Sequence, residues 1–182
     1  LRKTVNRWRT EDRPVLLGDF WNDGPLVGGC MAGGRYYFHI YANGDISPCV
    51  FAPVTCGNIF DILHGRSAYE TLSDFVRRNP VFAAYRRHQQ EVPDHAAPCL
   101  LIDHPEMFRQ IAREPSCRPA KNMAPGYLDG EIARAIDDSA AAWQAKLPDL
   151  SPHPALAEAP PQGTYQTTRA SAAAEPPTHA SA

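Results

Sequence analysis

The order of apolar and polar residues predicts a β-hairpin in the first third of the chain. Residues Tyr36–Tyr41 are rich in aromatic and β-branched side chains, and Ile46–Val50 resumes this strand pattern. Between them, the polar segment Ala42–Asp45 contains Gly44 and is typical of a tight turn. We expect two antiparallel strands with one face turned inward. A further short apolar strand is expected over Val15–Phe20.

Helical signals follow the hairpin. A capping box over Ser67–Glu70 predicts a helix that ends before Pro80, where a second helix begins. A third helix is predicted from Asp103, as its cap, to Arg113, and a fourth over Tyr127–Lys146 with apolar side chains on one face. These elements predict an α+β domain in which helices pack around a small hairpin.

The end of the chain has a different composition. From Pro148 to Ala182, proline, alanine, serine and threonine dominate and large apolar residues are few. Such a segment buries too little surface to offset the entropy lost on ordering, so we expect a disordered tail over 148–182.

The five cysteines supply the candidate chemistry. Cys30 is followed by thirteen residues, Gly44, four residues and Cys49, and Cys99 lies far downstream. Because the turn at Gly44 folds the two strands together, it brings Cys30 and Cys49 close. Thiolates at these separations suit a metal centre better than a disulfide framework, and they predict an iron–sulfur site.

Other interpretations of the cysteines stay open at this point. Buried free cysteines are common and behave as small apolar residues. A zinc site is less favoured, because no Cys-x2-Cys or His-x3-His pair occurs. Structural disulfides are less favoured still, because the number of cysteines is odd and the chain is large enough to build a core without them.

The segment Gly28–Cys49 resembles the SPASM/twitch auxiliary-cluster domain found at the C-terminus of many radical SAM enzymes. In that family a cysteine, nine to fifteen residues, a glycine, four residues and a second cysteine open the cluster-binding hairpin. The resemblance extends from Gly28 through Cys99 to His104. It implies a [4Fe-4S] cluster with Cys30, Cys49 and Cys99 as ligands.

The surroundings of these cysteines suit a cluster. Four glycines bracket Cys30 and allow the backbone to approach a bulky cofactor and direct amide N–H groups at its sulfides: Gly28, Gly29, Gly33 and Gly34. Cys99 lies on the approach to the helix expected at Asp103. Amide donors and the helix dipole at that position are expected to favour the thiolate.

The fourth ligand is left open by the sequence. Cys56 ranks first, because it follows Cys49 closely and completes a four-thiolate set if the intervening segment loops back. An iron left open to substrate, as in twitch-type domains, ranks second, and His104 ranks third. Asp103 is another polar neighbour of Cys99 but is better explained as the helix cap. Cys117 is not expected to be a ligand.

The resemblance also implies a domain organisation. Residues 1–26 are expected to be the end of a preceding, missing radical SAM core, with the cluster domain over 27–114 and a helical extension over 115–147. The Cys-x3-Cys-x2-Cys signature of the radical SAM core does not occur here. We therefore expect S-adenosylmethionine to act only through that core, which is either fused upstream or a separate chain, and no autonomous catalysis.

Two function classes follow from these observations. The first is the auxiliary cluster domain of a radical SAM oxidoreductase or maturase, acting on a peptide or cofactor precursor. The second is a stand-alone metal-binding module, with zinc or iron–sulfur, without catalysis. The net charge of −2 argues against nucleic acid, and no run of eighteen apolar residues predicts a membrane span. Unpaired cysteines favour a reducing cytoplasm.

Overall fold

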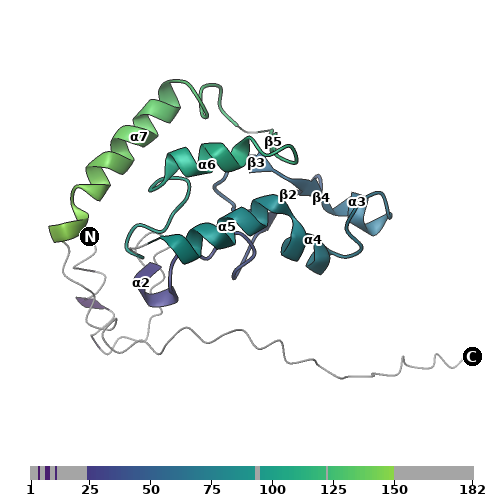
Figure 1. Ribbon diagram of the computed structural model, residues 1–182, viewed down its shortest axis with the longest axis horizontal. Coiled ribbons are helices and arrows are strands. Elements are labelled where there is room, and N and C mark those ends of the chain that lie inside the picture. Colours follow the sequence, from purple (N-terminus) through teal and green to yellow (C-terminus); the bar gives the residue numbers. More distant parts are fainter. Residues whose placement is uncertain are drawn as a thin grey trace, which may run out of the picture.

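The structure is a computed structural model that describes Thr4, Arg7, Trp8, Glu11 and residues 24–92, 95–121 and 123–149. It has the α+β fold that the sequence predicts: two small antiparallel sheets with helices packed around them (Figure 1). The predicted strand over Val15–Phe20 and the predicted tail beyond Asp149 lie outside the described residues. The expected domain limits stay predictions.

The first sheet carries the predicted hairpin. Strand β1 (His39–Ile40) pairs with β2 (Asp45–Ser47), and β2 pairs with β4 (Gly57–Asn58), each time antiparallel. The backbone N–H of Gly44 donates to the carbonyl of Tyr41 at 2.8 Å, and Gly44 has a φ of 86°. This left-handed conformation favours glycine, so the predicted turn is confirmed.

The hairpin strands are shorter than predicted. The N–H groups of Tyr36 and Tyr37 both donate to the carbonyl of Met31, at 3.0 and 3.3 Å, which curls this segment back toward Cys30. At the other end, β2 stops before Pro48, which has no N–H to donate to a neighbouring strand. Residues 36–38 and 48–50, which the pattern assigns to strands, therefore lie in the loops next to Cys30 and Cys49.

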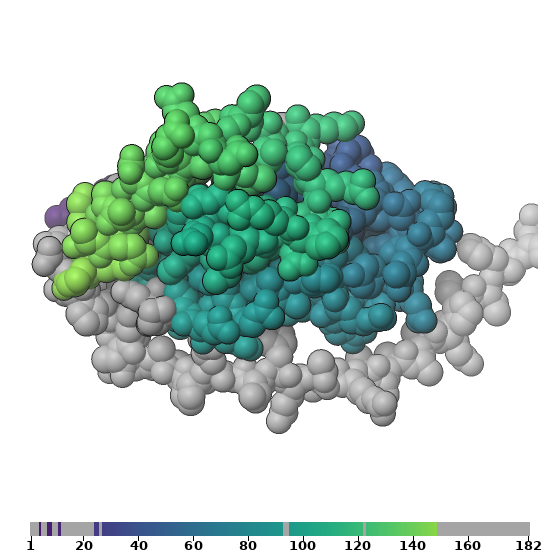
Figure 2. Space-filling view, turned by 45° about the horizontal axis from the view of Figure 1, so that its top comes forward, coloured from purple at the N-terminus to yellow at the C-terminus, as the bar shows by residue number. Residues whose placement is uncertain are grey.

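A second sheet joins distant parts of the chain. Strand β3 (Val54–Thr55) pairs antiparallel with β5 (Arg118–Pro119), and Val54 lies opposite Pro119. In the space-filling view, the green segment that follows the third predicted helix lies against the blue hairpin (Figure 2). The pairing thus ties the C-terminal part of the fold to the segment that carries Cys49.

The four predicted helices occur in the predicted order as α4 (Leu72–Arg78), α5 (Pro80–Glu91), α6 (Pro105–Ala112) and α7 (Glu131–Gln144). The short helices α2 (Gly24–Val27) and α3 (Ile59–Leu63) and the 3₁₀ helix η1 (Leu147–Asp149) were not predicted. Helix α7 begins later than predicted, because residues 126–130 form a turn in which the N–H of Gly130 donates to the carbonyl of Gly126 at 2.9 Å. Among the described residues, no helix combines the length and the apolar character that crossing a bilayer requires.

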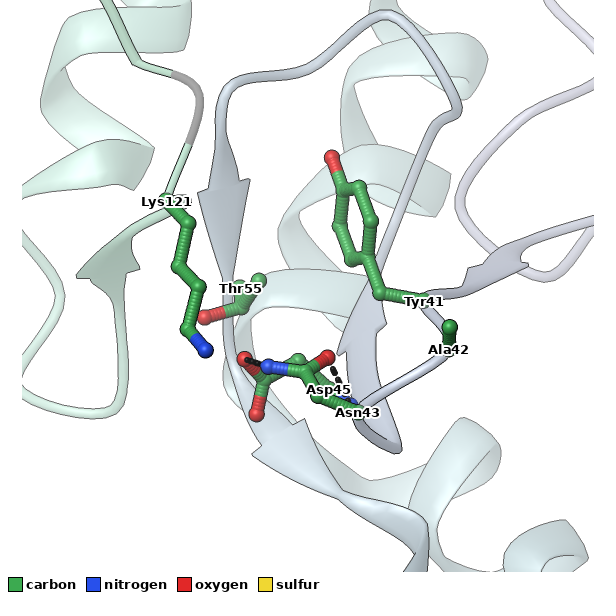
Figure 3. Close-up of a pocket in the computed structure, with 6 residues that line it drawn as sticks. All are labelled: Tyr41, Ala42, Asn43, Asp45, Thr55 and Lys121. Atoms are coloured by element: carbon green, nitrogen blue, oxygen red, sulfur yellow. Dashed lines mark hydrogen bonds between the residues drawn. The ribbon is translucent and has the colours of Figure 1, made fainter.

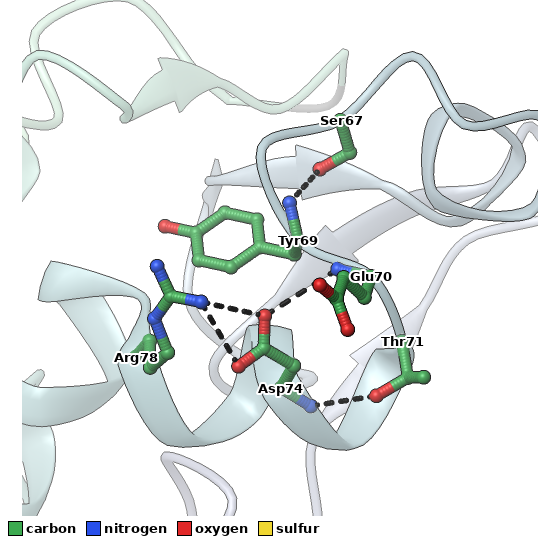
Figure 4. Close-up of polar contacts among 6 residues, drawn as sticks. All are labelled: Ser67, Tyr69, Glu70, Thr71, Asp74 and Arg78. Atoms are coloured by element: carbon green, nitrogen blue, oxygen red, sulfur yellow. Dashed lines mark hydrogen bonds and ion pairs between the residues drawn. The ribbon is translucent and has the colours of Figure 1, made fainter.

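The predicted capping box at Ser67 is wrong. Helix α4 begins after Thr71, whose hydroxyl accepts a hydrogen bond from the N–H of Asp74 at 3.1 Å (Figure 4). Ser67 instead accepts from the N–H of Tyr69 at 3.2 Å in a local turn. Asp74, which also forms an ion pair with Arg78 at 3.0 Å, supplies an acidic group in the first turn of the helix. Thr71 with Asp74 therefore caps the helix better than Ser67 with Glu70.

Aromatic residues fill the core between the first sheet and helices α4 and α5. Phe75 and Phe82 are fully buried and meet edge to face with ring centroids 5.5 Å apart. Asn79, also buried, caps α5 by accepting from the N–H of Val81 at 3.0 Å and donates to the carbonyl of Cys56 at 3.2 Å. This side chain fixes the α4–α5 corner against the strand that follows the hairpin.

Candidate metal centre

Three of the cysteines that the sequence singles out lie around one point of the core. Cys30 lies in the loop after α2, Cys49 follows β2, and Cys99 lies in the loop before α6. Burial is the main cause that raises the pKa of Cys30 and of Cys99, and the charge of Cys49 adds to it at Cys30 as the charge of Cys30 does at Cys99. All three affect the ionisation of Tyr37. The fold thus brings together residues that are far apart in the sequence.

Tyr37 reaches the cysteines with its hydroxyl, which lies 3.1 Å from the sulfur of Cys49. Burial and this hydrogen bond raise the pKa of Tyr37 well above its ordinary value. The phenol therefore stays protonated at neutral pH, and it is the donor whenever Cys49 is a thiolate.

A second tyrosine, Tyr85 on helix α5, is buried in the same core. It is 2% exposed, and its hydroxyl has no hydrogen-bond partner among the residues that the structure describes. Burial raises its pKa, followed by the charges of Cys49, Cys99, Cys30 and Cys117. An unpartnered buried hydroxyl is costly, so this group lacks an acceptor in the metal-free protein.

Backbone amides are directed at the sulfur atoms. The N–H of Ala32 donates to the sulfur of Cys30 and the N–H of Phe51 to that of Cys49, each at 3.5 Å. The amides of Leu101 and Ile102 lower the pKa of Cys99 by hydrogen bonding. Amide donors to the sulfurs are therefore present, as expected, although none of them belongs to a glycine.

The amides near the start of α6 favour the Cys99 thiolate, as expected, but they are not its largest influence. Burial, followed by the charge of Cys30, outweighs the amide donors and raises the pKa of Cys99 to about 12. Burial likewise raises the pKa of Cys30 to about 11. Both thiols are therefore protonated at neutral pH unless positive charge is brought to them. A metal centre supplies that charge, and its binding would release protons.

One glutamine joins two of the cysteine loops. The side-chain oxygen of Gln89, on α5, accepts from the N–H of Cys30 at 2.5 Å, and its nitrogen donates to the carbonyl of Pro98 at 3.0 Å. Pro98 directly precedes Cys99. Gly29 provides the room for this contact, because a Cβ at that position would lie 2.5 Å from the oxygen of Gln89. The sequence did not single out Gln89 or Tyr85, because their pattern is that of any amphipathic helix.

Asp103 and His104 have structural roles here. Asp103 is not the predicted helix cap: its carboxylate accepts from the N–H of Cys99 at 2.8 Å, and His104 holds the cap position of α6 without a side-chain bond. The Nε2 of His104 lies 2.8 Å from the carbonyl of Ala97. Because a carbonyl only accepts, this nitrogen carries the proton and is occupied.

Cys56 and Cys117 lie in the same core and are linked to each other. Burial, followed by the charge of Cys117, raises the pKa of Cys56, and the Cys56 thiol lies 3.6 Å from the carbonyl of Ile46, to which it donates. All five cysteines are free thiols. The cysteines thus fall into a group of three and a pair.

No set of three or more His, Cys, Asp or Glu side chains within the described ranges is arranged to hold a single metal ion. A [4Fe-4S] cluster makes a different demand, because each cysteine binds a different iron. Its ligands are therefore spaced more widely than those of one zinc ion.

A cavity of about 340 Å³ lies beside the hairpin turn. Tyr41 forms one wall, and Lys121 extends from the other side toward Asp45 and Thr55 (Figure 3). The charge of Cys49 raises the pKa of Tyr41, after burial, so this wall is electrostatically coupled to the cysteines. The volume lies at the lower end of the range typical of small-molecule sites.

Comparison with known proteins identifies no relative: no protein-family model, no curated protein and no solved structure matches this chain.

Gln89→Ala is expected to lower the free energy of unfolding of the metal-free, reduced protein by about 1–3 kcal/mol, because it removes two hydrogen bonds of about 0.5–1.5 kcal/mol each. Urea unfolding followed by circular dichroism measures this. Gln90→Ala is the matched control, since Gln90 is exposed on the same helix. Equal stability of the two variants would contradict the role of Gln89.

Proposed function

We propose that this chain binds a [4Fe-4S] cluster through Cys30, Cys49 and Cys99 and acts as the auxiliary cluster domain of a radical SAM oxidoreductase or maturase. The observation that carries the proposal is the contact of the Tyr37 hydroxyl with the sulfur of Cys49 at 3.1 Å, at a site where the charges of Cys49, Cys30 and Cys99 all act on this tyrosine. The Cys30–Gly44–Cys49 spacing, which resembles that of SPASM/twitch domains, supports it independently.

The residues present fit such a cluster. Three thiols are available as ligands, and Ala32 and Phe51 already direct their N–H groups at two of the sulfurs. The buried hydroxyl of Tyr85 has no partner among the described residues, and in this proposal it donates a hydrogen bond to a sulfur of the cluster. When bound, a cluster of this kind exchanges single electrons at a potential set by these hydrogen bonds and by burial.

The fourth position of the cluster is open in this proposal. Cys56, the first choice from sequence, lies with Cys117, and its thiol already donates to Ile46. The Nε2 of His104 is used by the carbonyl of Ala97. An exogenous group, such as an amine or carboxylate of a substrate, would then complete the coordination.

The proposed partner is a radical SAM core, either fused upstream or supplied as a separate chain in a reducing cytoplasm. That core would bind S-adenosylmethionine, and the substrate would be a peptide or a cofactor precursor. The cavity beside Tyr41 offers a place for a substrate group, and Tyr41 itself is affected by the charge of Cys49, after burial. Lys121 and Asp45 present one charge of each sign there, which suits the amino and carboxylate groups of a peptide-like molecule.

The ligand assignment predicts which cysteines hold iron. After anaerobic reconstitution, Cys30→Ala, Cys49→Ala and Cys99→Ala should each lose most of the bound iron, since even outer-shell changes alter metal affinity about 10–100-fold. Cys56→Ala and Cys117→Ala are matched controls that should keep it. Iron and sulfide assays with an absorption spectrum measure the outcome.

Full iron occupancy in Cys49→Ala would contradict the assignment. A colourless wild-type protein that takes up zinc in place of iron would instead support the alternative, a metal-binding module without catalysis.

Tyr85→Phe is expected to act in opposite directions on two forms of the protein. In the metal-free form it removes an unsatisfied buried hydroxyl and should raise the free energy of unfolding by about 1–3 kcal/mol. In the reconstituted form it removes a hydrogen bond to the cluster, which should lower the reduction potential because the reduced, more negative state loses a donor. Urea unfolding and potentiometric titration test the two effects. A destabilised metal-free protein with an unchanged potential would show that the hydroxyl has another partner.

Radical initiation needs three thiolates on one loop, and the Cys-x3-Cys-x2-Cys spacing does not occur in this sequence. We therefore expect no 5′-deoxyadenosine when the reconstituted chain is incubated with S-adenosylmethionine and a strong reductant. Addition of a chain that contains the radical SAM core should give product. Chromatography detects it, and product from the chain alone, above a cluster-free control, would refute this part of the proposal.

A further inference from the structure

Cys56 and Cys117 occupy facing positions at the end of the second sheet. In the β3–β5 ladder Val54 lies opposite Pro119, and Thr55 lies opposite Arg118. The next step of this antiparallel register places Cys56 opposite Cys117. These facing positions follow from the strand register, whether or not Cys30, Cys49 and Cys99 bind a cluster.

The hydrogen bonds show which kind of cross-strand position this is. The N–H of Ala120 donates to the carbonyl of Pro53 at 2.9 Å, so these two residues form a hydrogen-bonded pair of the same register. Hydrogen-bonded and non-hydrogen-bonded pairs alternate along an antiparallel ladder. Counting from Pro53, the facing cysteines fall on a non-hydrogen-bonded pair.

The backbone groups of both cysteines agree with this assignment. The N–H of Cys56 donates to the carbonyl of Ile46 at 2.8 Å, and its carbonyl accepts from the side chain of Asn79 at 3.2 Å. Both partners lie away from β5. The N–H of Cys117 donates to the carbonyl of Glu114 at 2.8 Å, within its own segment.

Facing residues at such positions have Cα atoms about 4.5 Å apart and the closest side chains of any antiparallel pair. This separation lies within the range of about 4.4–6.8 Å that disulfides span. Two thiols that face each other in this way need little backbone movement to bond.

We propose that Cys56 and Cys117 form a reversible disulfide that locks β3 to β5, with a low-molecular-weight disulfide such as oxidised glutathione as the oxidant. Cys117 is the more exposed of the two and attacks first as a thiolate, forming a mixed disulfide and releasing one reduced glutathione. Cys56 then attacks the sulfur of Cys117 and releases the second. Two electrons pass from the protein thiols to the glutathione disulfide, and the two thiol protons end on the two glutathione molecules.

The disulfide would hold together two segments that line the cavity beside the hairpin turn. Thr55 precedes Cys56 and lines this cavity together with Lys121, which follows β5 closely (Figure 3). Both cysteines pack in the hydrophobic core, and Cys56 is 4% exposed. Burial keeps the two thiols protonated, so the exchange is expected to be slow and the bond, once made, well protected.

The test uses the full chain, reduced and then equilibrated without metal in buffers of defined ratio of reduced to oxidised glutathione. Free thiols are blocked by alkylation, and chymotryptic peptides are identified by mass spectrometry. Cleavage after Phe51 separates Cys49 from Cys56, and cleavage after Phe108 separates Cys99 from Cys117. The expected result is a crosslinked peptide pair that contains Cys56 and Cys117 and is lost on reduction.

The bond should also raise the midpoint of thermal unfolding of the oxidised over the reduced protein, on the order of 10 °C for a loop of about sixty residues. This difference should vanish in Cys117→Ser and persist in Cys30→Ser, the matched control. Complete alkylation of Cys56 and Cys117 after oxidation of the folded protein would overturn the proposal. So would a crosslink of Cys56 to Cys30, Cys49 or Cys99. The peptide map of the wild-type chain decides the question even if a variant fails to fold.

Discussion

Close packing of helix α5 against the loop that carries Cys30 is the constraint on which the candidate site depends. Gly33 has a φ of 68°, and a Cβ there would lie 2.3 Å from the side chain of Tyr85. One helical turn further on, Gln89 occupies the space that a Cβ at Gly29, with a φ of 108°, would need. Only glycine meets both the steric and the backbone requirement at these two positions. The loop can therefore lie directly on the helix, where Gln89 joins it to the loop that carries Cys99.

The same packing sets the electrostatics of the site. Sealing the thiols against α5 removes water and raises the pKa of Cys30 to about 11. The nearby carboxylate of Asp103 raises it further, whereas Arg35 lowers it. Without a cofactor the most stable state at neutral pH is one of neutral thiols and protonated tyrosines. Such a site binds positive charge in exchange for protons, so binding weakens as the pH falls.

Local patterns made part of this structure predictable. The turn at Gly44 and the convergence of Cys30 and Cys49 follow from a glycine at a fixed offset between two strand-like segments, and the helices follow from their periodicity. The β3–β5 pairing did not follow, because two-residue strands about sixty residues apart leave no periodic signal. The N-cap of α4 was predicted at the wrong residue because Ser67 and Thr71 are each followed, three positions later, by an acidic residue. Only the fold selects Thr71.

The division of the cysteines into a group of three and a pair has a geometric origin. Cys30, Cys49 and Cys99 come from three separate loops that the fold brings into one core. Cys56 and Cys117 directly follow and precede paired strands, whose register sets them opposite each other. Ligands from separate loops suit a polynuclear centre, and facing positions of one ladder suit a sulfur–sulfur bond. Tyr85 is coupled to the group of three and also to Cys117. Because all four of these thiols raise its pKa after burial, loss of charge at any one of them eases the ionisation of Tyr85.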